Sequence, residues 1–156
     1  MDLLAGLKQE PIIKMDISDY CTAEAGSLVG DVIEVMNTAK CHSALIVRGG
    51  KLVGIFTDRD ILMKIANNPE TLKKMVDDFM TPAPVALPKT ATPAEALAIM
   101  KVKHLRNVPI IEDNGSVIGN FTHFSVLDLL TDAFPDVTVE QNAVLPRRFS
   151  RRRHGG

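Results

Sequence analysis

The sequence predicts a mixed α/β fold, of the α+β kind, built from two similar copies of one short motif. Two observations lead to this prediction: the chain contains an internal repeat, and each copy orders its elements as strand, helix, strand, strand, helix. A third is composition. Of 156 residues, 46% are hydrophobic and 24% are charged, which is typical of a compact globular protein rather than a disordered or fibrous one.

The repeat is visible before any local structure is assigned. Residues 41–47 align with residues 105–111 at an offset of 64, and the same offset places Met36 over Met100. After one extra residue in the second copy's turn, the match continues with Gly50, Gly54, Phe56, Thr57 and Leu62 over Gly115, Gly119, Phe121, Thr122 and Leu127. Six ordered identities with apolar residues between them indicate a duplicated unit.

Each copy begins with an extended segment, near residues 20–23 and 84–87, that leads into a helix. The second helix has a strong start, because Thr92 and Glu95 form a capping box with Pro93 at the first helical position. Apolar residues at three- and four-residue spacing give each helix one buried stripe. The stripes comprise Leu28, Val32, Val35 and Met36 in the first copy, and Ala96, Leu97 and Met100 in the second.

Two strands and a closing helix complete each copy. The turns between the strands contain Gly49-Gly50 and Asn114-Gly115, which supply the positive φ angles that tight hairpins require. The expected strands are residues 44–47, 51–56, 108–111 and 116–121, and the expected closing helices are residues 58–65 and 123–130.

The chain therefore divides into repeat 1 at residues 15–67 and repeat 2 at residues 81–134. Between them, the helical spacing of Leu72, Met75, Val76 and Phe79 predicts a linker helix over residues 68–80. Residues 1–14 form an N-terminal segment, and residues 135–156 form a basic tail that we expect to be disordered at its end. Copies of about fifty residues are small for a lone core, so the two should pack together about a pseudo-two-fold axis.

The formal net charge of −1 conceals an uneven distribution. Residues 147–156 hold five arginines and no acid, so 13 basic and 19 acidic residues remain in residues 1–146. An acidic body argues against nucleic-acid binding by the folded part. No apolar run reaches the ~18–20 residues that cross a bilayer, and the first residues lack the features of a signal peptide. We expect a cytoplasmic protein without membrane association.

The two cysteines, Cys21 and Cys41, are too few for a disulfide framework and lack Cys-x-x-Cys spacing, so we expect them to be reduced and structural. With His42 they do not reach the ligand count and spacing of a zinc site, and no metal is expected. No nucleophile, base and orienting group converge in the sequence, so no catalytic residue and no enzymatic activity are expected.

The segment that closes the first copy, Leu52-Val53-Gly54-Ile55-Phe56-Thr57-Asp58-Arg59-Asp60-Ile61-Leu62, resembles the signature of the cystathionine β-synthase (CBS) domain. Residues 117–125 resemble the same motif, and residues 76–82 resemble the phrase that opens a second copy. The resemblance covers about residues 15–132 and implies a stand-alone CBS pair, or Bateman module. Such a pair would be a non-catalytic regulatory module that binds an adenosine-containing ligand between its repeats and signals to a partner protein.

Thr57 and Asp60 lie where a strand runs into the first turn of a helix, and unpaired backbone N–H groups there favour a phosphate. Thr57 can offer its hydroxyl to a phosphate oxygen, and the two carboxylate oxygens of Asp60 suit the two hydroxyls of a ribose. The resemblance implies these roles at the matching positions and places Arg59 near the phosphates.

Pseudo-symmetry completes the expected nucleotide site from the other copy. Arg106 is nominated as the phosphate-binding cation, because arginine offers a planar fork of donors. Val85 and Ala86 are nominated as the wall against which the adenine lies.

A second, weaker site is expected at the equivalent positions His42, Gly119, Thr122 and Ser125. Ser125 stands where this copy should have an aspartate, and its neutral side chain cannot hold both ribose hydroxyls.

The expected ligand is AMP, ADP or ATP, ahead of S-adenosylmethionine or a dinucleotide, and no cofactor is required. We also expect a homodimer and a protein partner that the sequence does not identify. Helix capping alone would also explain Thr57 and Asp60. The alternative is therefore a structural or partner-binding CBS pair whose nucleotide site is vestigial.

Overall fold

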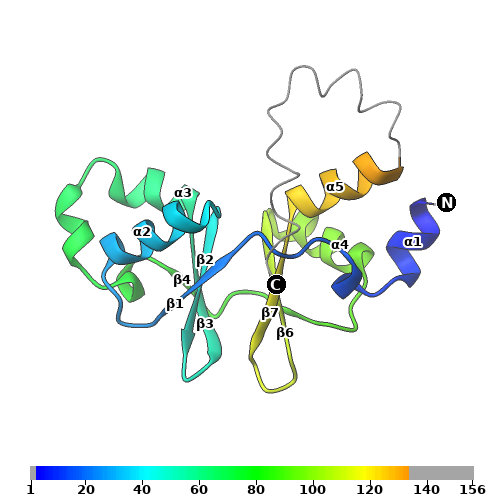
Figure 1. Cartoon of the computed structure of the whole chain (residues 1–156), viewed down its shortest axis with the longest axis horizontal. Coiled ribbons are helices and arrows are strands. Elements are labelled where there is room, and N and C mark those ends of the chain that lie inside the picture. Colours follow the sequence, from blue (N-terminus) through cyan, green and yellow to red (C-terminus); the bar gives the residue numbers. More distant parts are fainter. Residues whose placement is uncertain (1–2, 134–156) are drawn as a thin grey trace.

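The computed structural model describes residues 3–133, which form two α/β halves that stand side by side (Figure 1). The expected basic tail, residues 135–156, lies outside the described residues. The first half contains β1 (Cys21–Glu24), α2 (Val29–Ala39), β2 (Ser43–Arg48), β3 (Lys51–Thr57), the short α3 (Asp58–Asp60) and a π-helical turn, η2 (Ile61–Ile65). The second contains β5 (Leu87–Pro88), α4 (Pro93–Lys103), β6 (Asn107–Ile111), β7 (Val117–Thr122) and α5 (His123–Ala133). The predicted mixed α/β class and the element order of both copies are confirmed.

Each half is built on its own sheet with the same pairing pattern. In the first half the strand order is β1-β2-β3-β4, where β4 is Thr81–Pro82, and in the second it is β5-β6-β7. The first strand of each copy pairs in parallel with the second, and the second pairs with the third in an antiparallel hairpin. Both hairpins carry an irregularity before their turns, at Ile46/Val47 and at Ile110/Ile111. The two copies thus share the register of their strand pairing as well as their sequence pattern.

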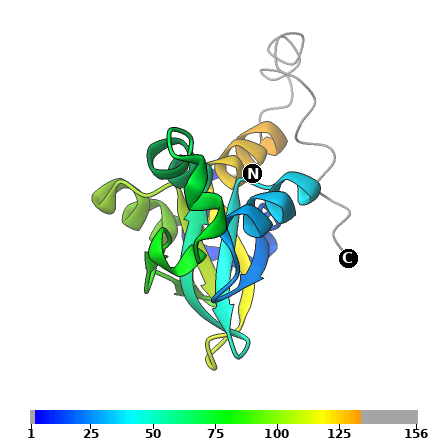
Figure 2. The ribbon, with the colours of Figure 1, turned by 90° about the vertical axis from the view of Figure 1, so that its left-hand side faces the viewer.

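The helices of both halves gather around one end of the strands, and the hairpin turns project at the other (Figure 2). The two hairpins touch near these turns, where Leu52 N donates to Gly115 O at 3.0 Å. Two separate cores fill the halves. The first gathers around Phe56, Ile46 and Val32, and the second around Phe121, Ile110 and Ile12.

The halves exchange segments. β4, which precedes the second copy, pairs with Gly54 and Ile55 of β3 in the first half. Residues 15–18, which precede β1, contact the second half: Asn120 N donates to Ile17 O at 2.8 Å. The N-terminal helix α1 (Leu3–Gln9) packs on α4, and Ile12 of η1 (Ile12–Lys14) is part of the second core. Each half is therefore closed by chain that precedes the other half.

Two equivalent glycines make this exchange possible. A Cβ on Gly54 would overlap Met80 Sδ, and a Cβ on Gly119 would overlap Ile17 Cδ1. The crossing segments thus lie directly on the backbone of β3 and β7, at the positions that the sequence alignment paired.

The predicted linker helix over residues 68–80 is wrong. That segment instead forms two short 3₁₀ helices, η3 (Pro69–Lys73) and η4 (Val76–Asp78), with extended backbone at Lys74. Lys74 O accepts from Val29 N at 2.9 Å, and Val76 N donates to Ser27 O at 2.8 Å. These bonds tie the segment to the start of α2 and use groups that a continuous helix would need for its own ladder.

The helix predictions hold in part. The capping box of α4 is confirmed: Thr92 Oγ1 accepts from Glu95 N at 3.3 Å, and Glu95 Oε2 accepts from Thr92 N at 2.8 Å. On α2 the buried residues are Val29, Val32 and Met36, whereas Val35 is exposed. Leu28, also predicted to be buried, is exposed because it precedes the helix as its N-cap.

Candidate functional site

The smaller of two clefts, with a volume of about 430 Å³, lies at the start of α3 and is closed by chain from the second copy. Its first wall is the end of β3 with the turn that follows. Its second wall is the crossing segment at residues 81–85, which precedes the second copy, together with the junction from α4 to β6. Its lining includes Thr57, Arg59, Asp60, Val85 and Arg106. The structure thus brings together five of the six residues predicted for the principal site, from three stretches of the chain: the start of α3, the segment before β5 and the junction from α4 to β6.

Ala86 is the exception. It does not line the cleft, where Ala83 and Pro84 stand beside Val85 instead. The wall is shifted because Ala83 N donates to Val53 O at 3.0 Å and draws the crossing segment onto β3. Ala83 adopts a left-handed conformation, with φ of 44°, that favours glycine. The sequence carried no signal for this turn beyond the following proline.

Thr57 and Asp60 form a capping box at the start of α3. Thr57 N donates to Asp60 Oδ2 at 3.0 Å, and Asp60 N donates to Thr57 Oγ1 at 3.4 Å. The other carboxylate oxygen, Oδ1, pairs with Lys64 Nζ at 2.9 Å. The backbone of Thr57 therefore orients the Asp60 carboxylate through one oxygen, while the other oxygen pairs with the flexible side chain of Lys64.

Cationic groups converge on this cleft. Arg59 and Arg106 line it from opposite copies, Lys64 joins them, and His104 is a further lining residue. Asp58 and Asp60 are the acidic lining residues, and Asp58 Oδ1 accepts from Arg59 N at 2.8 Å. Sequence reasoning missed Lys64 and His104. The signal for Lys64 was its position one turn after Asp60, where the two side chains can meet.

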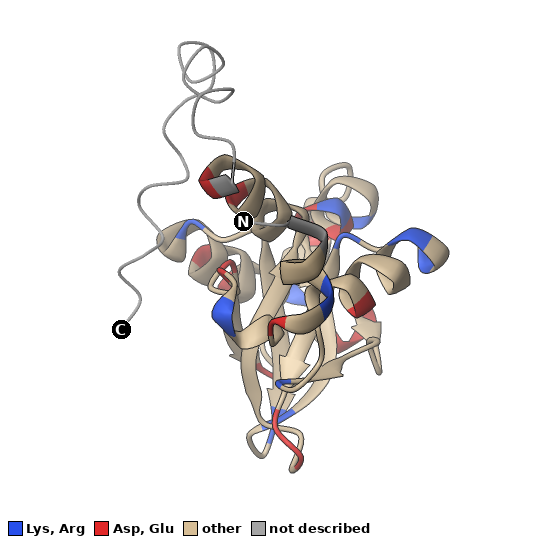
Figure 3. Ribbon diagram, turned by 90° about the vertical axis from the view of Figure 1, so that its right-hand side faces the viewer, with Lys and Arg blue, Asp and Glu red and all other residues tan. Residues whose placement is uncertain are grey.

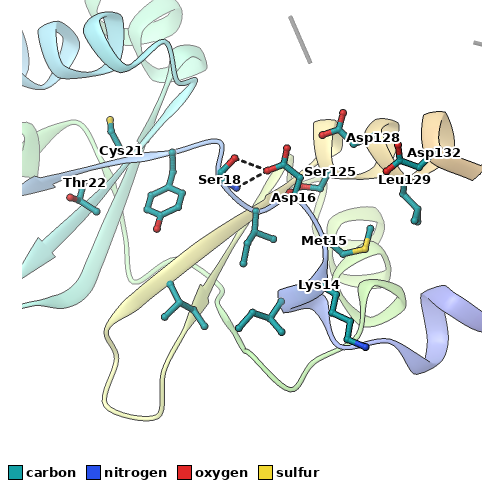
Figure 4. A pocket seen from close by; sticks show the side chains of 14 residues that line it. Lys14, Met15, Asp16, Ser18, Cys21, Thr22, Ser125, Asp128, Leu129 and Asp132 are labelled. Carbon is teal, nitrogen blue, oxygen red and sulfur yellow. Dashed lines mark hydrogen bonds between the residues drawn. The ribbon is translucent and has the colours of Figure 1, made fainter. Parts of the chain in front are cut away.

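The larger cleft, of about 1030 Å³, lies at the equivalent place in the other half, beneath α5 (Figure 4). Of the residues predicted for the weaker site, only Ser125 lines it. Ser125 Oγ accepts from Thr122 N at 3.1 Å, as Asp60 accepts from Thr57, and donates to Asp16 O at 2.5 Å. Its hydroxyl thus holds the crossing segment in place.

The remaining three residues of the predicted weaker site do not reach the larger cleft. Thr122 is buried, and Gly119 is covered by Ile17. His42 Nδ1 lies 3.2 Å from Asp19 Oδ2, and its ring packs on Phe124 with centroids 5.0 Å apart. Ile17 and Asp19 both belong to the segment before β1 that crosses to the second half. This segment therefore occupies the places where pseudo-symmetry predicted ligand contacts.

The two clefts differ in charge. The larger one is lined by three aspartates, Asp16, Asp128 and Asp132, and by one basic residue, Lys14. Asp16 Oδ1 accepts from Ser18 Oγ at 2.6 Å (Figure 4), and α5 carries acidic residues but no lysine or arginine (Figure 3). The smaller cleft has three basic residues, Arg59, Lys64 and Arg106, against two acidic ones. The smaller cleft is thus the better suited to an anion.

A buried polar group joins the two halves between the clefts. Asn107 Oδ1 accepts from Ser43 Oγ at 2.7 Å and from Asn120 Nδ2 at 3.0 Å, and the same Asn120 nitrogen donates to Asp19 O at 3.2 Å. Ser43 and Asn107 are equivalent in the repeat, so the pseudo-two-fold axis passes near this bond. Sequence reasoning missed the group, because polar residues within predicted strands give no sign of what they face.

Residues 3–133 contain no cluster of three or more His, Cys, Asp or Glu side chains that could hold a metal ion. No helix in the same part of the chain is long and apolar enough to cross a membrane.

Comparison with known proteins places these features in a family. The model of the CBS domain matches the chain twice, at residues 13–67 and 76–132. A probable arabinose 5-phosphate isomerase of Haemophilus influenzae is 33% identical over 90 residues, which is 57% of this chain and 27% of that protein. The chain thus spans about a quarter of the length of this relative.

Solved structures show the same fold. The CBS domain pair of a protein crystallised with 5′-methylthioadenosine and S-adenosyl-L-methionine superposes with a TM-score of 0.64 at 24% identity, covering 72% of this chain and 92% of that one. The cytosolic domain of the Mg²⁺ channel MgtE, in complex with ATP, superposes with a TM-score of 0.61 at 21% identity, covering 72% of this chain and 45% of that one.

Proposed function

Because the chain belongs to the CBS-domain family, in which such pairs are regulatory modules, we propose that it binds an adenosine-containing ligand in the smaller cleft and signals its presence to a partner protein. The observation that carries the proposal is the convergence of Thr57, Asp60, Arg59 and Arg106 on one cleft of about 430 Å³. That volume is in the range of small-molecule sites, about 300–1,000 Å³.

Each part of an adenine nucleotide has a complementary wall. Phosphates would meet Arg59, Arg106 and the hydroxyl of Thr57, since guanidinium groups form strong charge-assisted bonds to phosphate oxygens. The adenine would lie against Pro84 and Val85, where the backbone of the crossing segment offers hydrogen-bonding groups. AMP, ADP and ATP are the ligands that use all these walls.

The ribose would bind at Asp60. One oxygen of this carboxylate is already engaged by Thr57 N, and the other is paired with Lys64 Nζ at 2.9 Å. A ribose hydroxyl would replace the Lys64 ammonium at this oxygen. Because the lysine side chain is flexible, the ammonium could then turn towards the phosphates. Ligand binding and the Asp60–Lys64 ion pair would therefore be coupled.

Two related structures support a ligand of this class. Two similar structures are complexes with adenosine compounds: 5′-methylthioadenosine with S-adenosyl-L-methionine in one, and ATP in the other. S-adenosylmethionine carries no phosphate and would leave the arginines of the smaller cleft without an anionic partner, so we place it behind the nucleotides.

The alternative function is a structural or partner-binding pair with a vestigial nucleotide site. It is favoured by the capping box, because Thr57 and Asp60 already have local partners without a ligand. In either case we propose a binding module rather than an enzyme, at work in the cytoplasm.

We also propose a homodimer. Leu62 and Met63, which follow α3, are 70% and 74% exposed, and Leu127 and Leu130 on the equivalent α5 are 44% and 38% exposed. Leu62 and Leu127 are equivalent in the repeat, so both halves contribute exposed apolar side chains to a surface that a second chain could cover.

Native mass spectrometry of freshly purified protein tests the ligand class directly. We expect a retained or added AMP, ADP or ATP to give a complex of one nucleotide per chain. A protein that takes up none of these nucleotides, with S-adenosylmethionine also unbound, would leave the vestigial site as the better account.

A further inference from the structure

The two cysteines of the chain meet at the edge of the first sheet. Cys21 is the first residue of β1, and Cys41 stands two residues before β2, the strand with which β1 pairs. Both side chains are half-buried and pack against the first core. Cys21 Sγ lies 3.7 Å from Ser43 O, its hydrogen-bond acceptor. The Cys41 side chain lies beside the backbone of the same serine and beside the Cys21 side chain.

The pair is chemically unequal. The hydrogen bond from Cys21 and the backbone of Ser43 hold the pKa of the Cys41 thiol below its usual range. The same bond to Cys41, together with burial, raises the pKa of Cys21. Because the thiolate is the reactive form, Cys41 is the nucleophile of the pair and Cys21 is the resolving thiol.

The pair is also within reach of small molecules. Cys21 lines the larger cleft, and in Figure 4 its sulfur points towards the helices of the first half, away from the aspartates of α5. Hydrogen peroxide is small and neutral, so the aspartates of the larger cleft do not repel it, and both cysteines are partly exposed.

We propose that Cys21 and Cys41 form a peroxide-responsive site that closes reversibly to an intramolecular disulfide. The Cys41 thiolate attacks one oxygen of hydrogen peroxide, the O–O bond breaks, and hydroxide leaves as the sulfur becomes a sulfenic acid. The Cys21 thiol then attacks that sulfur, the S–O bond breaks and water leaves. The two thiols give up two electrons and two protons, and the peroxide becomes two water molecules.

The experiment treats the folded protein with hydrogen peroxide near neutral pH and follows intact mass and maleimide-reactive thiols. The expected wild-type result is the joint loss of both thiols, a mass lower by two hydrogens, and full recovery with dithiothreitol. Cys21→Ser should instead yield a sulfenic acid on Cys41 that dimedone traps. Cys41→Ser should react at least about ten times more slowly, since burial still raises the pKa of the remaining Cys21 thiol.

Several results would overturn the proposal. These are an unreactive wild-type protein, a disulfide that forms only between chains or only in urea-unfolded protein, equal rates for the two serine variants, and oxidation of one cysteine that leaves the other free. Serine keeps a hydrogen-bonding group at each position, so melting curves of the two variants should remain close to that of the wild type.

Discussion

Asp60 has two roles that the structure superimposes: it closes a capping box with Thr57, and it presents a carboxylate to a cleft lined with arginines. Arg106, by contrast, is an exposed residue after α4 that lines the cleft and caps no helix. Its contribution to ligand binding is therefore the more easily separated from its contribution to stability.

Replacing Arg106 should weaken nucleotide binding without destabilising the fold. We expect Arg106→Ala to lower ADP affinity by about tenfold or more, because a hydrogen bond to a charged group contributes roughly 1.5–3 kcal/mol. The loss should shrink as salt is raised, since ions screen an exposed pair. Isothermal titration at two salt concentrations measures it. Lys103→Ala, at the end of the same helix but outside the cleft, is the matched control and should bind like the wild type.

Asn120 tests the polar group between the halves. It is fully buried, and removing its side chain would strip Asn107 Oδ1 and Asp19 O of a donor. We expect Asn120→Ala to lower the free energy of unfolding by about 1–3 kcal/mol. Asn114→Ala, which removes an exposed turn bond to Ser116 N, should cost less. Urea denaturation compares them, and equal losses would contradict the importance of the buried group.

At the scale of elements, the exchange of crossing segments depends on Gly54 and Gly119. A methyl group at either position collides with the segment above it, but the two neighbours differ in stiffness. Met80 is flexible and can turn aside, whereas Ile17 is β-branched and would clash as far as its Cβ.

Gly119→Ala should therefore be more destabilising than Gly54→Ala. We expect a loss of about 1–3 kcal/mol for Gly119→Ala, as for other overpacked sites, and a smaller loss for Gly54→Ala. Gly6→Ala in α1, where a Cβ meets nothing within 4 Å, is the control and should not destabilise. Thermal melts rank the three, and an inverse order would show that the crossing segments yield differently.

The elements also show what local patterns can predict. The capping box of α4 and the glycine turns were predictable, because their partners lie within a few residues in sequence. The segment over residues 68–80 was not, because Lys74 O and Val76 N bond to the start of α2, some forty-five residues away. Helical spacing there reflects burial of Val76 in the first core and not a continuous helix.

At the scale of the whole molecule, the repeat predicted which residues would share the principal cleft. Five of six predicted residues line it, because pseudo-symmetry carries long-range information that single segments lack. It failed at the second cleft, where the crossing segment places Ile17 over Gly119 and Asp19 against His42. Pseudo-symmetry predicts that the two copies share a backbone arrangement. It does not predict the contacts of side chains that differ between the copies.

The exposed apolar surface predicts the assembly. We expect light scattering to give a dimer of the 17.0 kDa chain at micromolar concentration. Met63→Glu should shift it to monomer, because a buried unpaired charge is costly at an interface. Val102→Glu is the control: Val102 is 77% exposed on α4 and is not one of the four side chains of the proposed surface. A wild-type monomer with and without nucleotide would contradict the dimer.

The charge difference between the clefts leads to the central claim, one nucleotide site per chain. The larger cleft offers three aspartates and a serine where the smaller one offers arginines and Asp60. Phosphate-bearing ligands should therefore bind only at the smaller cleft with appreciable affinity.

Isothermal titration of the wild type, Asp60→Ala and Glu95→Ala with ADP tests this claim most directly. Glu95→Ala removes the carboxylate of the other capping box, that of α4, which lies outside both clefts, so it controls for the loss of a helix cap without touching the ligand. We predict one tight site per chain in the wild type and in Glu95→Ala, and affinity at least about tenfold weaker in Asp60→Ala. Two equal sites per chain, or Asp60→Ala binding like the wild type, would contradict the account.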